Sequence, residues 1–191
     1  MLYNDSGDVM KSSDKNIEYV KLDSYNFEHA YQVQKLIWDD DPDYQCFYNK
    51  AMNPSIYDTC FLVYLGADLI GITGTYIEDF DTESIWLDWF GILPEYRGNG
   101  YGETILLDTI RYCQSFDKFA YFRLDTTYWE DRPAIGLYDK VMDLKEKYTR
   151  EDTEEIDHHY LIYTYNLKRT NYTKPWNNRF IGLVDYYKCC N

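Results

Sequence analysis

One stretch of the chain, residues 85–116, constrains the fold more than any other. It opens with an apolar run at residues 85–93, whose length and aromatic and branched side chains predict a strand buried on both faces. Pro94 ends that strand, because proline has no N–H to give to a ladder. A glycine-rich turn at residues 97–102 and an amphipathic helix follow. The helix is expected to bury Leu106, Ile110 and Cys113 and to turn Glu103, Asp108 and Arg111 elsewhere.

The turn itself, with the sequence RGNGYG, is a candidate anion site. Glycines let successive backbone N–H groups converge, and the start of the helix adds partial positive charge. A Walker loop would need Gly-Lys-Ser/Thr, which the chain lacks, and a dinucleotide loop would need G-x-G-x-x-G where this chain has G-x-G-x-G. A nucleotide-binding Rossmann module is therefore disfavoured, while a surface turn that binds nothing remains the alternative.

The turn and its lead-in resemble a motif of the GCN5-related N-acetyltransferase (GNAT) superfamily, Arg/Gln-x-x-Gly-x-Gly/Ala. Arg97, Gly100 and Gly102 match that motif, and Ile92-Leu93-Pro94 matches its hydrophobic-x-Pro lead-in. In the family this loop holds the pyrophosphate of acetyl-CoA, so the resemblance implies acetyl-CoA as the cosubstrate. The family also places backbone N–H groups that polarise the thioester where the preceding strand bends away from its neighbour. The cofactor-binding residues implied are Phe90, Ile92, Arg97, Gly98, Asn99, Gly100, Tyr101 and Gly102.

A second segment, residues 124–140, carries the resemblance further. It reads Leu124-Asp125-Thr126 and then AIGLYDK at residues 134–140, which is similar to the family's L-D-T/C … N-x-x-A/L … Y-E-K-x-G-F stretch. Glu130 or Asp131 replaces the usual Asn, and Met142-Asp143 replaces the usual Gly-Phe. These departures keep open a non-catalytic acyl-CoA-binding or regulatory module.

The order of elements along the chain agrees with the family fold. Strand patterns occupy residues 16–22, 59–65, 69–77, 85–93, 118–125 and 160–167, and helical patterns residues 26–38, the segment after the turn, and the segment from Pro133. We expect a single-domain α/β (α+β) fold with a mixed, mostly antiparallel sheet flanked by helices. Residues 1–15 would be a flexible leader, 16–167 the acyl-CoA N-acyltransferase domain, and 168–191 a C-terminal extension of unknown role.

The resemblance implies transfer of an acetyl group to a primary amine by direct attack, without an enzyme nucleophile. Tyr138 stands where the family has the acid that protonates the thiolate; a phenol pKa of about 10 against about 8.5 for a thiol suits that role. Its alternative role is packing in the apolar stripe of its helix. Candidates for the base are Asp88, Asp125 and Glu78, and a chain of waters is a further alternative. Asp88 is surrounded by aromatic residues and could instead be a structural aspartate satisfied by hydroxyls or backbone groups. Asp125 matches the family position and could instead brace the loop after its strand.

Charge and composition bear on the partners. A net charge of −14 argues against nucleic acid and anionic membranes, because phosphates are bound by clustered Lys and Arg. The aspartates at positions 39, 40, 41 and 43, beside Tyr44, Phe47 and Tyr48, would suit a cationic amine or would simply form a solvated loop. We expect a small-molecule or peptide amine as the acceptor, cationic in character, and the family allows a homodimer.

The cysteines and histidines indicate neither a disulfide framework nor a metal site. The five cysteines form no CxxC pair and have no metal-ligand spacing with the three histidines. His158 and His159 are expected to be ordinary side chains. Free thiols, the absence of a signal-like leader and the absence of a bilayer-spanning apolar run together predict a cytoplasmic protein.

Overall fold

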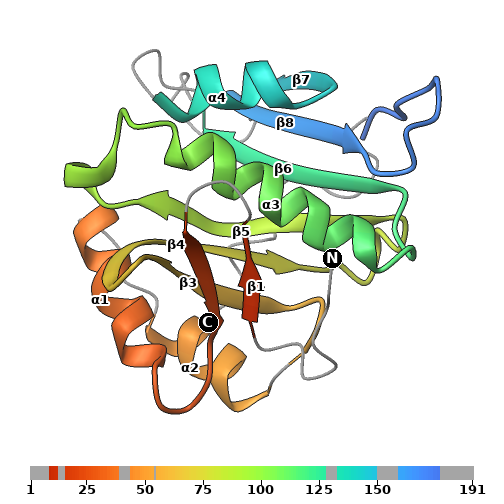
Figure 1. Ribbon diagram of the computed structural model, residues 1–191. Coiled ribbons are helices and arrows are strands. Elements are labelled where there is room, and N and C mark those ends of the chain that lie inside the picture. The colour runs from red at the N-terminus through yellow and green to blue at the C-terminus, as the bar shows by residue number, and fades with distance from the viewer. Residues whose placement is uncertain are drawn as a thin grey trace.

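A mixed sheet of eight strands organises the protein, in the order β1-β2-β3-β4-β5-β6-β8-β7 (Figure 1). The computed structural model describes residues 9–12, 16–38, 44–53, 55–127, 133–149 and 159–176. The strands are β1 (Val9–Lys11), β2 (Ile17–Lys21), β3 (Thr59–Leu65), β4 (Asp68–Tyr76), β5 (Ser84–Ile92), β6 (Tyr121–Thr127), β7 (Leu144–Thr149) and β8 (His159–Asn166). The helices are α1 (Phe27–Ile37), α2 (Tyr44–Met52), α3 (Tyr101–Ser115) and α4 (Pro133–Val141), with a 3-10 turn at Pro94–Tyr96. Neighbouring strands are antiparallel except β5 and β6, which are parallel, so the predicted fold class is confirmed.

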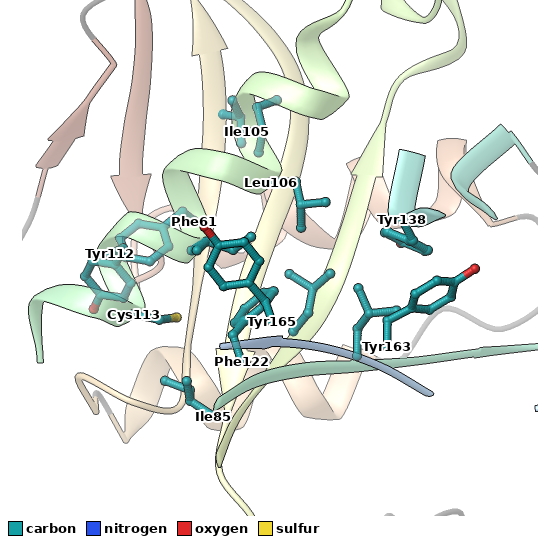
Figure 2. Close-up of a cluster of buried hydrophobic side chains, with 14 of the residues drawn as sticks. Phe61, Ile85, Ile105, Leu106, Tyr112, Cys113, Phe122, Tyr138, Tyr163 and Tyr165 are labelled. Atoms are coloured by element: carbon teal, nitrogen blue, oxygen red, sulfur yellow. The ribbon is translucent and has the colours of Figure 1, made fainter. Parts of the chain in front are cut away.

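Helices cover both faces of the sheet, because side chains alternate between the faces along each strand. On one face, Ile85 and Leu87 of β5 and Phe122 and Leu124 of β6 pack with α3 and Tyr138 of α4 (Figure 2). On the other face, α1 and α2 cover part of β3 and β4. The residues expected on the buried face of α3 are all buried: Leu106, Ile110 and Cys113. Within the described ranges, none of the helices has the length and apolar character that spanning a bilayer requires.

Asp108 was expected to turn away from the core, and that expectation is wrong. Its side chain is buried under α3, where it accepts a hydrogen bond of 2.7 Å from the hydroxyl of Tyr19 on β2 and pairs with Arg111. A fully buried tyrosine hydroxyl needs an acceptor, and Asp108 supplies it. Burial, together with the Asp108 carboxylate, raises the pKa of Tyr19.

Packed structure extends beyond residues 16–167 on both sides. Strand β1 pairs antiparallel with β2, so the expectation of a flexible leader is wrong for residues 9–11. At the other end, Trp176 is buried against Trp86 and Ile162, and its backbone N–H donates to the Glu146 carboxylate at 2.7 Å. Residues 168–176 therefore belong to the packed domain.

Candidate active site

The edge of β5 that faces β4 is interrupted by a bulge. Ile72 of β4 pairs with Gly91, and Gly74 pairs with Asp88, so Trp89 and Phe90 together oppose the one residue between them on β4. Trp89 has φ +40°, a backbone conformation that a side chain other than glycine rarely adopts. A bulge bends its strand and re-aims the local N–H groups. The bulge therefore lies at Trp89 and Phe90, and Gly91 and Ile92 pair with β4 again before the glycine-rich turn.

An opening in the sheet lies beside this bulge. The parallel pairing of β5 with β6 joins Ser84 to Tyr121, Ile85 to Phe122 and Trp86 to Arg123. Beyond those pairs β6 keeps its full pairing with β8 on its other side. The second half of β5, which includes the bulge, therefore has no described partner strand on its β6 side, and this gap in the pairing is the opening between β5 and β6.

The glycine-rich turn lies at the end of β5 and leads into the first turn of α3. Gly98 and Gly100 have φ of +77° and +81°, and a Cβ at either position would meet no atom within 4 Å. Gly100 is the N-cap of α3, so the free N–H groups of the first helical turn follow it. The Asn99 amide donates to the carbonyl oxygens of Tyr96 and Arg97, both at 3.2 Å. A turn of positive-φ glycines at a helix start, called the cradle below, has the backbone geometry in which N–H groups bind anions.

The remaining turn residues hold the cradle against its neighbours. Nε of Arg97 donates to the carbonyl oxygen of Ile92 at 2.9 Å, which ties the turn to the end of β5. A Cβ on Gly102 would lie 3.4 Å from Leu137 of α4, at ordinary van der Waals distance, so the start of α3 packs beside α4. The structure thus gathers all the predicted cofactor-binding residues from Phe90 to Gly102 at one place beside the opening.

Tyr138 of α4 lies on the α3 side of the bulge. It is 6 % exposed, and its ring centroid lies 6.2 Å from that of Phe90 and 5.5 Å from that of Tyr163 on β8. Figure 2 shows Tyr138 and Tyr163 at one end of the buried cluster, with the hydroxyl of Tyr163 directed away from it. That hydroxyl donates to Asp139 at 2.7 Å, and burial together with this bond raises the pKa of Tyr163 to about 12. Tyr138, by contrast, is in contact with the bulge.

Asp88 lies on the opposite face of the sheet, where it forms an ion pair. Its carboxylate is 3.0 Å from Nζ of Lys50 on α2, and Lys50 also pairs with Asp58. Burial raises the pKa of Asp88, while Lys50 and the N–H of Trp89 hold it down. Burial lowers the pKa of Lys50, but the two aspartates outweigh it and keep the ammonium protonated. A lysine pairing with Asp88 from a distant segment carries no signal in the sequence, and Lys50 was missed for that reason.

Asp125 and Glu78 complete a group of carboxylates on this second face. Burial raises the pKa of Asp125 to about 6, and the neighbouring Asp88 contributes to the rise. Burial also raises the pKa of Glu78, with additions from Asp79, Asp81 and Asp125. Among the side chains that the structure describes, no cation forms an ion pair with Asp125 or Glu78. Asp125 thus interacts with both Asp88 and Glu78, and among these three carboxylates Asp88 alone has a cationic partner within the described residues.

Two other sequence expectations concern the acidic segment beside α2 and the grouping of possible metal ligands. The aspartates at 39, 40, 41 and 43 lie outside the described residues, whereas the neighbouring Tyr44 and Tyr48 are partly exposed and stack at 6.4 Å. Phe47 is buried in the core beneath α2. In the part of the chain that the structure describes, no three His, Cys, Asp or Glu side chains are grouped as a metal site requires.

Comparisons with known proteins identify the family and the fold. The model of the acetyltransferase (GNAT) family matches residues 24–144. No curated protein matches the chain. Among solved structures, RimL, a ribosomal L7/L12 alpha-N-protein acetyltransferase in complex with coenzyme A, has a TM-score of 0.66 at 11 % identity, over 83 % of this chain and 98 % of that one. The spermidine/spermine N-acetyltransferase SpeG from Vibrio cholerae has a TM-score of 0.62 at 16 % identity, over 80 % and 94 %. Arabidopsis thaliana NAA60 with a bisubstrate analogue has a TM-score of 0.60 at 14 % identity, over 78 % and 97 %.

Proposed function

The chain belongs to the acetyltransferase (GNAT) family, and we propose that it transfers an acetyl group from acetyl-CoA to a primary amine by direct attack. One observation carries the proposal: the opening between β5 and β6 lies beside both a bulged strand and an open N–H cradle at the start of α3. An acyl donor held by its diphosphate in the cradle can place its thioester in the opening. An acceptor can then approach from the face that carries the carboxylates.

The chain's own residues supply what the reaction needs. Residues 97–102 bind the diphosphate through backbone N–H groups, and the N–H groups of Phe90 and Ile92 stabilise charge on the thioester oxygen. The amine nitrogen forms a bond to the carbonyl carbon, the carbon–sulfur bond breaks, and the leaving thiolate takes a proton. Tyr138 donates that proton, since it lies against Phe90 on the side of the opening toward α4.

We assign the role of base to Asp125 rather than to Asp88. A base must be free to accept a proton near neutral pH, and Asp88 is ion-paired with Lys50. Asp125 has a pKa raised to about 6 by burial and by Asp88, which is close to the value a general base needs. The attacking amine therefore loses its proton to Asp125, directly or through a water.

Replacement of Asp125 by Asn is expected to separate activity from stability. The rate of acetyl transfer should fall about 10²-fold. This is the lower end of the range for loss of a general acid or base, because water can still carry the proton. In the wild type, kcat/KM should rise with pH through about 6 as Asp125 ionises, and the variant should lack this limb. Because the pKa of Asp125 is raised in the folded state, the free energy of unfolding of the wild type should fall as pH rises from about 4 to about 6.

The variant should consequently be no less stable than the wild type at pH 7, because the raised pKa means that ionised Asp125 disfavours the folded state at that pH. Rate profiles between pH 5 and 8 and thermal unfolding at pH 5 and 7 measure both effects. An unchanged acid limb in Asp125→Asn would exclude this residue as the base.

We propose a cationic amine as the acceptor. By name, RimL acts on a protein alpha-amine and SpeG on spermidine and spermine, which supports an amine acceptor of either size. The carboxylates of Glu78 and Asp125, which form no ion pair with a described cation, favour a positive charge on the acceptor face. The thiols of Cys46, Cys60 and Cys113 are free, in keeping with a reaction in the cytoplasm.

Glu78→Gln is expected to raise the KM for a dicationic acceptor roughly three- to tenfold at low salt, because it removes one charge that attracts the substrate. The difference from wild type should shrink at high salt, and the KM for acetyl-CoA should not change. Acceptor KM values at two ionic strengths measure this. Equal values in both proteins at low salt would show that Glu78 does not face the acceptor.

A panel of amines tests the proposed function as a whole. Small monoamines, diamines, polyamines and peptides with free N-termini or lysines are each incubated with acetyl-CoA, and release of the free thiol is followed. We expect amine-dependent thiol release, strongest with cationic acceptors. CoA binding without turnover on any amine would instead support a non-catalytic acyl-CoA-binding module.

A further inference from the structure

We infer that Lys50 of α2 is a positioning residue for acyl transfer, which holds the bulge of β5 through Asp88 and cancels the carboxylate charge beside it. This inference rests on the acetyl transfer proposed above. Lys50 was not a candidate from the sequence, and it contacts neither the cradle of residues 97–102 nor Tyr138 in any described interaction. Its contribution would therefore pass entirely through Asp88.

The ion pairs of Lys50 join three separate segments. The side chain is 8 % exposed, and Nζ lies 3.0 Å from Asp88 on β5 while also pairing with Asp58 ahead of β3. The ion pair of Lys168 with Asp117 is a useful contrast, because the Asp117 side chain is 92 % exposed. A buried ammonium between two carboxylates is held in a defined place, whereas an exposed pair is weakened by water and salt.

Asp88 transmits this constraint to the bulge. It directly precedes Trp89, and its carboxylate interacts with the backbone N–H of Trp89, the residue with positive φ. The indole of Trp89 is fixed as well: its N–H donates to the Cys46 thiol at 3.3 Å, and its ring packs on Trp38. A backbone in a sparsely populated conformation persists only when its surroundings impose it. If Trp89 relaxed to negative φ, the N–H groups of Phe90 and Ile92 would point elsewhere.

The charge of Lys50 matters as much as its position. Negative charge develops on the thioester oxygen during attack, and an uncompensated carboxylate next to the bulge would oppose it. The titratable groups that interact with Asp88 are Lys50 from α2, Asp58 ahead of β3, Cys60 from β3 and Asp125 from β6, and Cys46 of α2 interacts with Lys50 and Cys60. Lys50 is the cation in that described set. Without it, Asp88 would be either protonated at low pH or an unpaired anion at higher pH.

The test compares Lys50→Met with Lys50→Arg and uses Lys168→Met as the matched control. We expect Lys50→Met to lower kcat about 10²-fold, the loss that follows removal of one group that stabilises the oxyanion, with the KM for acetyl-CoA unchanged. The loss should grow as pH rises, because removing Lys50 raises the pKa of Asp88 and more of the uncompensated anion forms at higher pH. Lys50→Arg should restore most of the rate, and Lys168→Met should match the wild type.

A double-mutant cycle shows whether Lys50 acts through Asp88. On an Asp88→Asn background, which has no charge to cancel, adding Lys50→Met should change kcat less than twofold and should leave the pH profile unaltered. If Lys50→Met alone does not fold, the comparison of Asp88→Asn with the double variant still provides the test. An equal loss of kcat on both backgrounds would overturn the inference, as would a Lys50→Met variant with wild-type kcat and a lowered melting temperature alone.

Different experimental results would refute the proposed function and the inference about Lys50. Wild-type protein that releases no thiol from acetyl-CoA with any amine refutes the proposed function, and the inference about Lys50 with it. Active wild-type protein whose kcat does not respond to Lys50→Met refutes the inference alone.

Discussion

Tyr138→Phe is expected to lower the rate of acetyl transfer by about 10²–10⁴-fold, while the affinity for CoA stays nearly unchanged. The ring of Tyr138 packs between Phe90 and Tyr163, and phenylalanine keeps that packing. Only the hydroxyl is removed, so the leaving thiolate loses its proton donor. Single-turnover rates, together with CoA titrations, separate the chemical step from binding.

Tyr163→Phe is the matched control for this prediction. Tyr163 lies next to Tyr138 in the same cluster, but its hydroxyl donates to Asp139 and is directed away from the cluster (Figure 2). We expect its rate to stay within about threefold of the wild type, as for loss of a partly exposed hydrogen bond. Equal losses in the two variants would mean that the substitutions act by loosening α4 against β8. A wild-type rate in Tyr138→Phe would assign the proton to another donor.

Gly100→Asp is expected to abolish stabilisation by CoA. In the wild type, CoA at a hundredfold excess over its Kd should raise the free energy of unfolding by about 2.7 kcal/mol. Gly100 is the N-cap of α3, and a Cβ there meets no atom within 4 Å, so the aspartate fits sterically. Its carboxylate would occupy the anion cradle, in a backbone conformation that aspartate adopts more readily than most residues.

Gly66→Asp provides the control for strain and charge. Gly66 also has positive φ, +61°, and open space around its Cβ position, but it lies in the turn between β3 and β4. This variant should lose a similar amount of intrinsic stability and still be stabilised by CoA. A CoA-dependent shift in melting temperature that survives in Gly100→Asp would remove the diphosphate from residues 97–102. NADH should stabilise none of the three proteins.

Local chemistry explains what the sequence could predict. The glycine-rich turn and the end of β5 before Pro94 depend on residues adjacent in the chain, and both were expected from the sequence. The order of most elements along the chain followed from the periodic segments, and the family comparison confirmed the fold. Strand β6 ends at Thr127 and not at the expected residue 125, because its pairing with β8 extends to Thr127.

Interactions between distant segments explain what the sequence could not predict. Asp88 was recognised as a carboxylate among aromatic residues, but nothing near it in the chain indicates that Lys50 pairs with it. Asp108 was wrongly expected on the polar side of its helix. The buried hydroxyl that it accepts a hydrogen bond from belongs to Tyr19 on β2, which the sequence around Asp108 does not indicate. The burial of Trp176 depends likewise on Trp86 and Ile162, which belong to β5 and β8. In each case the deciding partner lies in another element of the fold.

Initial rates measured while acetyl-CoA and an active amine are both varied test the central claim most directly. Direct attack requires both substrates to be bound together, so double-reciprocal plots should intersect, with one thiol released for each amine acetylated. Parallel lines would indicate an acetylated enzyme intermediate. Thiol release that does not depend on the amine would contradict acetyl transfer itself.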